Sequence, residues 1–363
     1  MQIQQGGHAS DQGFISEASH SNSNGEALMH KPTLGNVLIT SHIFGLLHPE
    51  AFDLLAAEGL EYDLQRRPAG SWSEETLISL LEGKEAIIAG VEEPLTRRVF
   101  DSAPQLRVIS RLGVGVDNVD LAAASDQGII VTITLEANVN ATADLAFALI
   151  MAAARRIPQL DRAVREGRWE LIIAEDVSEK TLGIVGLGRI GKAVARRAKG
   201  FEMRVLAYDK VQDERFAEEY GIRYVSLEEL LSSSDFVTIH LSPSPESGKF
   251  IGESQLRQMK PTAYLINASR GIIVDESALI RALQEGWIAG AGLDVYEKEP
   301  LQQSPLLGLA NVVLTPHVGG ATYPALRAMS LRSAENVIQV LRNERPGGVV
   351  NPEVYSRQEG RRR

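Results

Sequence analysis

The fold is decided by the stretch Thr181-Leu-Gly-Ile-Val-Gly-Leu-Gly-Arg-Ile-Gly191. Its first five residues are mostly apolar and predict a buried strand. The residues that follow, Ile190–Phe201, place apolar side chains near helical spacing and predict a helix. A glycine-rich turn between a strand and a helix is typical of a site that holds a dinucleotide pyrophosphate at the helix N-terminus.

Each glycine of this turn has its own physical use. The first permits the tight turn, the second lets the backbone approach a pyrophosphate, and the third lets the helix pack on the strand. The next apolar run ends at Asp209, where a carboxylate accepts hydrogen bonds from ribose hydroxyls and repels a 2′-phosphate. We therefore expect NAD as the cofactor, in preference to NADP; the alternative is a purely structural turn. The expected binding residues here are Gly186, Gly188, Arg189, Ile190, Gly191 and Asp209.

The composition narrows the class of protein. A chain of 363 residues predicts two domains, and its net charge of −10 argues against nucleic acid or an anionic membrane as the main partner. The absence of cysteine excludes disulfides, thiolate zinc sites and cysteine nucleophiles, and it fits a cytoplasmic location. We find no metal-ligand spacing, and no apolar run long enough to span a bilayer.

The two ends of the chain differ from the rest. Residues 1–32 are rich in polar residues and histidine, lack the pattern of a signal peptide, and are expected to be disordered. The fold is expected to end near Pro352, which leaves residues 353–363 as a tail, with the basic Arg361–Arg363 as its solvated end.

Strand and helix signals alternate in two sets, which predicts two α/β domains with doubly wound, Rossmann-like parallel sheets. The first set has expected strands at Val37–Thr40, Ala86–Gly90, Leu106–Ser110 and Ile129–Thr134. The second set has expected strands at Leu182–Val185, Arg204–Tyr208, Phe236–His240, Ala263–Asn267, Gly290–Asp294 and Val312–Thr315. Between the sets, Ala141–Arg168 reads as a long apolar helix that is broken at Pro158.

The last strong helix signal, Ala325–Leu341, follows the second set and has no strand after it. We expect this helix to return to the first domain. The substrate domain would then be discontinuous, formed by residues 33–136 and 322–352, with the NAD-binding domain of residues 137–321 inserted in it.

Three charged side chains follow strands of the second set: Arg270, Glu299 and His317. Ligands of an open parallel sheet bind outside the carboxyl ends of its strands, so these groups are expected to converge. Arginine holds a carboxylate bidentately, and histidine moves a proton near neutral pH, helped by a neighbouring carboxylate. Taken singly, each has an ordinary surface or turn alternative, and Glu297 rivals Glu299 for the role of the carboxylate. Together they predict a hydride-transfer site.

The chain resembles the D-isomer-specific 2-hydroxyacid dehydrogenase family, which includes D-3-phosphoglycerate dehydrogenase, D-lactate dehydrogenase and glyoxylate/hydroxypyruvate reductase. The resemblance covers roughly residues 36 to 345, and its motifs match in order and at compatible spacing. The motifs are Arg111-Leu-Gly-Val-Gly-Val-Asp-Asn-Val-Asp120, Ile184-Val-Gly-Leu-Gly-Arg-Ile-Gly191, Leu265-Ile-Asn-Ala-Ser-Arg-Gly271, Ile288-Ala-Gly-Ala-Gly-Leu-Asp-Val-Tyr-Glu-Lys-Glu-Pro300 and Leu314-Thr-Pro-His-Val-Gly-Gly320.

The resemblance implies a role for each matching position. Arg270 would bind the substrate carboxylate and carbonyl oxygen, His317 would be the acid/base, and Glu299 would orient it and favour its protonated form. The implied substrate-binding residues are Arg270, Asn138 and the backbone amides of Val114 and Gly115. The implied contacts to the nicotinamide carboxamide are Ala268 and Asp294, and His240 is expected to line the cofactor cleft. Homodimerisation is also implied, with the helix Ala141–Ala154 as the expected contact.

The sequence therefore predicts an NAD-dependent D-2-hydroxyacid dehydrogenase, similar to D-3-phosphoglycerate dehydrogenase, that acts on a small 2-hydroxy or 2-keto acid. Near Gly90, however, Glu92 and Glu93 stand where phosphoglycerate-specific relatives tend to place a basic residue, which weighs against a phosphorylated substrate. Asp144 replaces the family's usual glutamate. The alternatives are a glyoxylate/hydroxypyruvate reductase and an NAD(H)-sensing, corepressor-like binding protein, because such corepressors also keep the catalytic triad.

Overall fold

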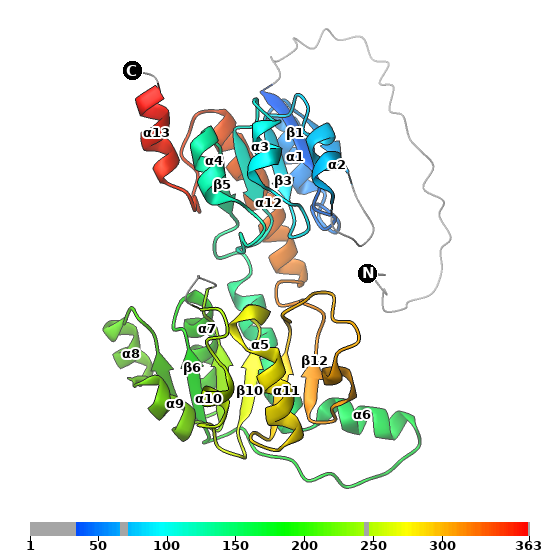
Figure 1. Cartoon of the computed structure of the whole chain (residues 1–363), viewed down its shortest axis with the longest axis vertical. Helices are drawn as coiled ribbons and strands as arrows, with labels where there is room; N and C mark the ends of the chain where they lie inside the picture. The colour runs from blue at the N-terminus through cyan, green and yellow to red at the C-terminus, as the bar shows by residue number, and fades with distance from the viewer. Residues whose placement is uncertain (1–33, 66–71, 243–246, 362–363) are drawn as a thin grey trace. The chain divides into compact units, whose positions relative to one another are not determined.

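The computed structural model describes residues 34–65, 72–242 and 247–361, the side chains of 358–361 excepted. The chain divides into two compact units (Figure 1). Unit 1 runs to Thr134 and resumes at Ser330, and unit 2 is the continuous stretch Leu135–Met329. The second boundary lies eight residues after the expected end of the cofactor domain at residue 321. The N-terminal segment 1–32, expected to be disordered, lies outside the described residues.

Unit 1 is built on a five-stranded parallel sheet in the order β2-β1-β3-β4-β5. Its strands are β1 (Gly35–Ile39), β2 (Leu60–Leu64), β3 (Ala86–Ala89), β4 (Val108–Arg111) and β5 (Ile130–Ile133). Its helices are α1 (Glu50–Ala57), α2 (Glu74–Leu80), α3 (Arg97–Asp101), α4 (Leu121–Gln127), α13 (Glu353–Arg361) and the last part of α12 (Tyr323–Leu341). Alternate strand residues such as Leu38 and Ile109 pack against α2, α3 and α4 in one buried core. The sequence patterns missed β2, an edge strand that exposes its central residues.

Unit 2 has a seven-stranded parallel sheet in the order β12-β11-β10-β9-β6-β7-β8. The strands are β6 (Thr181–Val185), β7 (Arg204–Tyr208), β8 (Arg223–Tyr224), β9 (Phe236–Ile239), β10 (Tyr264–Asn267), β11 (Gly290–Leu293) and β12 (Val312–Leu314). The helices are α5 (Val139–Ala154), α6 (Ile157–Arg165), α7 (Arg189–Lys199), α8 (Glu214–Tyr220), α9 (Leu227–Ser233), α10 (Glu253–Leu256) and α11 (Glu276–Gln284). The strand order reverses between β6 and β9, so the carboxyl ends of these strands flank a topological switch point. Both sheets are parallel, as the alternation of strand and helix signals predicts.

The break in the long linking helix lies before Pro158, not at it. Helix α5 ends at Ala154, Arg156 adopts a left-handed conformation with φ of 51°, and α6 begins at Ile157. Pro158 therefore stands in the first turn of α6, where a missing backbone N–H leaves no helical bond unmade. The expectation of one helix kinked at the proline is wrong.

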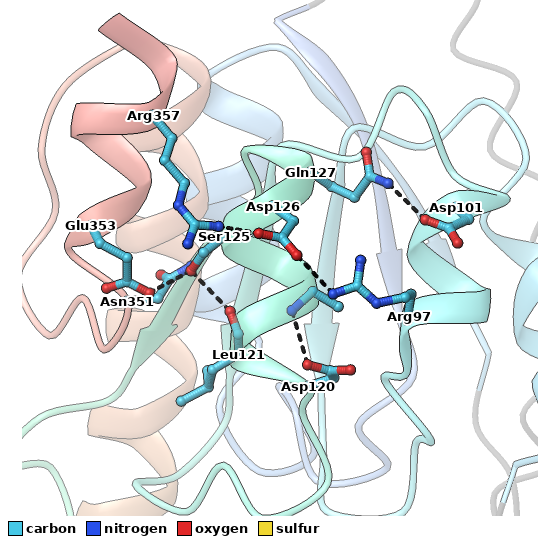
Figure 2. Close-up of polar contacts among 11 residues, drawn as sticks. Arg97, Asp101, Asp120, Leu121, Ser125, Asp126, Gln127, Asn351, Glu353 and Arg357 are labelled. Atoms are coloured by element: carbon cyan, nitrogen blue, oxygen red, sulfur yellow. Dashed lines mark hydrogen bonds and ion pairs between the residues drawn. The ribbon is translucent and has the colours of Figure 1, made fainter. Parts of the chain in front are cut away.

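The expectation that the fold ends near Pro352 is also wrong, because residues 353–361 form α13. Figure 2 shows how this part of the chain is held against α4. Ser125 donates its hydroxyl to Glu353 at 2.6 Å, and Arg357 pairs with Asp126. Val354 is fully buried. The polar composition of the segment gave no helix signal, because the helix is held by one fully buried apolar side chain, one ion pair and one hydrogen bond.

A buried asparagine joins the same segment to the edge of the sheet. Residues 348–351 run beside β5, where Val350 donates its N–H to Val131 and Ile133 donates to Gly348. The Asn351 side chain is 1% exposed; it accepts the N–H of Val131 at 2.8 Å and donates to Ser125 and Ile129. The last segment of the chain thus covers the open edge of the five-stranded sheet.

Candidate active site

The sequence-predicted residues of unit 2 follow the carboxyl ends of six of its strands. The glycine turn follows β6, Asp209 follows β7 and His240 follows β9. Arg270 follows β10, Asp294 follows β11 and His317 follows β12. The switch point divides these loops into a glycine half on β6–β7 and a charged half on β10–β12. This is the edge at which open parallel sheets bind their ligands.

The three glycines of the turn meet three different surroundings. Gly186 has φ of +96°, and a Cβ atom there would lie 2.8 Å from the backbone of His240. At Gly191 a Cβ atom would lie 2.2 Å from the carbonyl oxygen of Gly186, so the helix could not pack as closely. At Gly188 a Cβ atom would meet nothing within 4 Å. The fold therefore requires glycine at positions 186 and 191. At Gly188 the missing side chain leaves open space at the N-terminus of α7, which fits a pyrophosphate.

Asp209 holds the glycine turn from the neighbouring strand. Its Oδ2 accepts the N–H of Leu187 at 2.7 Å, and its Oδ1 accepts the N–H of Val211 at 3.0 Å. The carboxylate is half-buried. It stands at the position where a dinucleotide fold presents an acid to a ribose, and it keeps further lone pairs for that purpose.

His240 is a half-buried residue with a neutral imidazole beside the same turn. Its Nε2 lies 2.9 Å from the hydroxyl of Thr238, and its Nδ1 is inaccessible to solvent and has no hydrogen-bond partner among the described residues. Burial lowers the pKa of His240 to about 4. The side chain is therefore uncharged at neutral pH and is suited to lining a cleft rather than to carrying a proton.

Arg270 is positioned by a buried asparagine at the end of β10. Asn267, 1% exposed, accepts the N–H and the hydroxyl of Ser269 and donates its Nδ2 to the carbonyl oxygen of Arg270 at 2.9 Å. Gly271 then passes so close to Tyr296 that a Cβ atom would lie 1.9 Å from its backbone. The Arg270 guanidinium donates to the carbonyl oxygen of Ser269 at 2.7 Å and is half-buried.

His317 and Glu299 form a direct pair. The Nδ1 atom of His317 lies 2.7 Å from Oε2 of Glu299, while Oε1 accepts the N–H of Tyr296 at 3.1 Å. Burial would raise the pKa of Glu299, but the hydrogen bond and charge of His317, the Tyr296 N–H and the charge of Arg270 hold it below its usual value. Glu299 is therefore an anion at neutral pH, and it orients the imidazole so that Nε2 is left to exchange a proton.

Glu297, the rival carboxylate, lies elsewhere. Its Oε1 accepts the N–H of Glu276 at 3.1 Å and lies 3.6 Å from the ammonium group of Lys249. In return, the Glu297 N–H donates to the carboxylate of Glu276. The geometry therefore places Glu299, and not Glu297, against the histidine.

The loop that carries His317 is held by Asp294. This carboxylate, 1% exposed, accepts the hydroxyl of Thr315 at 2.7 Å and the N–H groups of Val318 and Gly319 at 2.9 and 2.8 Å. The Asp294 carbonyl oxygen accepts the N–H of His317, whose φ is 53°. Asp294 thus secures the loop that carries His317.

Two contributors to this arrangement carried no assignment from the sequence: Asn267 and Tyr296. The Tyr296 hydroxyl donates to the carbonyl oxygens of Thr315 at 2.8 Å and Leu293 at 3.2 Å, so it joins the ends of β11 and β12. Burial and the nearby carboxylates raise its pKa, which keeps the hydroxyl a donor. A buried polar side chain as the last residue of an otherwise apolar strand is the signal that would have singled out Asn267.

The remaining substrate-binding residues fall in different units. Val114 and Gly115 lie on the half-buried loop after β4 of unit 1. Asn138 is the first residue before α5 of unit 2, and Gly320 lies close to its side chain. Ala268 is buried in the loop after β10. Within residues 34–65, 72–242 and 247–361, no cluster of His, Asp and Glu has the composition of a metal site, and no helix is long and apolar enough to cross a bilayer.

Comparisons with known proteins agree with this geometry. Residues 147–319 match the model of the D-isomer specific 2-hydroxyacid dehydrogenase NAD-binding domain. A glyoxylate reductase from Korarchaeum cryptofilum is 48% identical over 304 residues, which are 82% of this chain and 91% of that protein. A crystal structure of a glyoxylate reductase from Paecilomyes thermophila superposes with a TM-score of 0.79 at 30% identity, covering 89% of this chain and all of that one.

A third relative contains bound ligands. The crystal structure of an Aquifex aeolicus D-lactate dehydrogenase complexed with NAD and lactic acid matches with a TM-score of 0.77 at 30% identity, over 87% of this chain and 99% of that one. The fold agrees with these relatives. The chain belongs to the D-isomer-specific 2-hydroxyacid dehydrogenase family, whose members are NAD(P)-dependent oxidoreductases of 2-hydroxy acids.

Proposed function

We propose that this enzyme reduces glyoxylate, or a closely similar small 2-keto acid, with NADH. The observation that carries the proposal is the pair formed by His317 and Glu299, with the charge of Arg270 acting on the same carboxylate. The relatives named as glyoxylate reductases indicate the substrate. The loop after β3, residues 90–96, supports a substrate without a phosphate, because it has no basic side chain and carries the half-buried Glu92. Glu93 is 1% exposed and accepts the N–H groups of Gly90 and Glu92, so its carboxylate is turned into the loop.

The residues divide the chemistry among them. Arg270 binds the substrate carboxylate and its carbonyl oxygen through its planar guanidinium, which also stabilises negative charge on that oxygen. Protonated His317 donates a proton from Nε2 to the same oxygen, since Nδ1 faces Glu299. NADH, when bound over the glycine turn, supplies the hydride that the keto carbon accepts. Oxidation of the hydroxy acid requires neutral His317 as the base.

A panel of keto acids tests the substrate. We expect NADH oxidation to be fastest with glyoxylate or hydroxypyruvate, slower with bulkier keto acids, and slowest with 3-phosphohydroxypyruvate. Arg270→Lys should raise KM and lower kcat, because lysine keeps the charge and loses the bidentate geometry. A parent enzyme that binds NADH but reduces none of these acids would favour the corepressor-like alternative.

The choice of NAD over NADP follows from Asp209. Its carboxylate would bind the ribose hydroxyls and repel a 2′-phosphate. Asp209→Asn keeps the shape of the side chain and removes the charge, so it should reduce the ratio of kcat/KM for NADH to that for NADPH. Equal kcat/KM values for the two cofactors in the parent enzyme would contradict the assignment.

We also propose that the enzyme is a homodimer, with a different contact from the one expected. Helix α5 is largely buried within unit 2, where it packs against α7, β10 and β11, so it offers little surface to a partner. The irregular segment 168–177 instead exposes Trp169 and Leu171 at 93% and Ile173 at 85%. We assign these exposed apolar side chains to a contact with a second copy of the chain.

The dimer is tested by its mass in solution. Replacing all three apolar residues by serine should convert the dimer into a monomer in sedimentation experiments. The control replaces Val211, which is 79% exposed but outside the segment, by serine. A monomeric parent enzyme would contradict the proposal. We place the enzyme in the cytoplasm, in keeping with its lack of cysteine.

A further inference from the structure

The loop of unit 1 that follows β4 is held by two buried side chains that the proposed mechanism does not use: Arg111 and Thr134. Arg111 is the last residue of β4, and Thr134 directly follows β5. They are 1% and 0% exposed. An arginine and a threonine so completely buried need hydrogen-bond acceptors, and both find them in the backbone of this loop.

Thr134 fixes the beginning of the loop. Its N–H and its hydroxyl both donate to the carbonyl oxygen of Gly113, at 2.9 and 3.2 Å, and its hydroxyl oxygen accepts the Gly113 N–H at 3.0 Å. Gly113 has φ of +137°, which a side chain would strain. In a trans peptide the C=O and the following N–H point in opposite directions. The N–H of Val114 therefore points away from Thr134.

Arg111 fixes the loop two residues later. Its Nε donates to the carbonyl oxygen of Gly115 at 3.0 Å, and its Nη1 donates to the carbonyl oxygen of Ala89, at the end of β3, at 2.9 Å. The dipeptide Val114–Gly115 thus lies between two fixed carbonyl groups. Among the described residues no acceptor takes the N–H of Val114 or Gly115, and both residues are half-buried rather than enclosed.

We infer that Arg111 and Thr134 are positioning residues that aim the N–H groups of Val114 and Gly115 at the substrate carboxylate. The inference rests on the proposed function, together with the carboxylate-binding role that the family resemblance implies for Val114 and Gly115. Two backbone donors fixed in advance bind an anion without the entropy cost of ordering a mobile loop. The guanidinium of Arg111 adds a positive charge behind the loop. Neither side chain needs to touch the substrate.

Thr134→Val is the sharpest test, because valine keeps the shape of threonine and its backbone N–H while removing the hydroxyl. We expect the Kd of oxamate, a carboxylate that is not reduced, to rise about tenfold for the NADH-loaded enzyme, as for one lost charge-assisted hydrogen bond. KM for the keto acid should rise with it. The kcat and the KM for NADH should stay within about twofold of the parent values, since the proton and hydride machinery is untouched.

The matched control is Thr132→Val, two residues earlier in β5. It removes a fully buried hydroxyl that lies 3.5 Å from the carbonyl oxygen of Ile109 and makes no hydrogen bond to the loop. We expect Thr132→Val to bind oxamate as the parent does, and Thr134→Ser to restore binding. Arg111→Lys tests the other end of the loop. It removes the hydrogen bond from Nε of Arg111 to the carbonyl oxygen of Gly115, so it should also weaken oxamate binding.

Three outcomes decide the inference. Weakened oxamate binding in folded Thr134→Val and Arg111→Lys, with NADH binding retained, supports it. Parent-like oxamate binding in both folded variants overturns it while the proposed function stands. A parent enzyme that neither binds oxamate nor reduces a keto acid refutes the proposed function, and the inference with it.

Discussion

Nδ1 of His317 lies 2.7 Å from Oε2 of Glu299, and the two residues come from loops that follow neighbouring strands, β12 and β11. The pair is anchored on both sides: Tyr296 donates its N–H to the carboxylate, and Asp294 accepts the N–H of His317. The position of the imidazole is therefore set by the ends of two strands and not by a mobile loop. This precision suits proton transfer, which requires hydrogen-bond distances.

The first prediction concerns this pair. Glu299→Gln keeps much of the geometry but removes the negative charge that favours the imidazolium, so the alkaline limit of keto-acid reduction should move to lower pH. Glu297→Gln is the control and should leave the profile unchanged, because that carboxylate contacts Glu276 and Lys249. A shift in the Glu297 variant alone would mean that the wrong carboxylate has been assigned.

The acid/base role of His317 is tested by its removal. His317→Ala should lower kcat by about 10²–10⁴-fold while NADH still binds.

The second prediction separates two glycines of one turn. Gly191→Ala should lower the melting temperature strongly, because its Cβ atom would lie 2.2 Å from a backbone oxygen that cannot move aside. Gly188→Ala should leave the melting temperature near that of the parent, since its Cβ atom meets open space. The same methyl group would enter the space that fits the pyrophosphate and weaken NADH binding. Calorimetry of the NADH-free protein and NADH titration measure the two effects, and an equal loss of stability in both variants would contradict the prediction.

The third prediction is a pH dependence of stability. The pKa of His240 is lowered by burial to about 4 in the folded enzyme, against about 6.5 in an unfolded chain. Between these two pKa values the unfolded state binds a proton at this residue and the folded state does not. The free energy of unfolding therefore falls as the pH falls from about 6.5 towards 4, by at most about 1.4 kcal/mol per pH unit for one proton. Below the folded pKa this dependence ends.

His240→Asn removes that proton. Denaturant unfolding of the NADH-free enzyme at several pH values should therefore show a shallower loss of stability in this range than in the parent. His42→Asn, at an exposed position in the loop after β1, should behave as the parent does. Identical slopes in the parent and in His240→Asn would show that the ring is hydrated in solution.

The fourth prediction concerns the segment that covers β5. Asn351→Ala leaves the N–H of Val131 and two other buried groups without their partner, so the free energy of unfolding should fall by about 2–3 kcal/mol. Arg357→Gln removes only an exposed ion pair with Asp126 and should change stability little. Little change in the Asn351 variant would mean that water replaces the amide.

Much of this structure can be predicted from the sequence, because the local apolar runs mark the strands and the parallel sheet then fixes where the residues after them lie. Buried parallel strands such as β10 are short apolar runs, and the residues after them must lie at one edge of the sheet. For this reason the sequence alone predicts that Arg270, Glu299 and His317 lie together. The glycine turn is legible for the same reason, since two of its glycines are fixed by steric contacts.

The patterns failed where stability comes from a few polar contacts. Strand β2 exposes Glu61 and Tyr62, and α13 buries Val354 among polar neighbours, so neither is a continuous apolar run. Pro158 was placed as a kink because a proline looks alike in the middle of a helix and in its first turn. The asparagine hydrogen bonds that hold the Arg270 loop have no periodic signature at all.

The division of unit 1 into two separated stretches of sequence governs the order in which the enzyme matures on the ribosome. Translation delivers β1 to β5 first, then unit 2, and only afterwards the rest of helix α12 from Ser330 and the segment at residues 348–351 that covers β5. Unit 2, being continuous, is therefore complete before unit 1 receives its second stretch of chain. Until synthesis passes Asn351, the backbone N–H and C=O groups at the β5 edge of the sheet therefore lack their partners from residues 348–351. During this interval the exposed edge can pair with other chains, which is the contact that a chaperone would block.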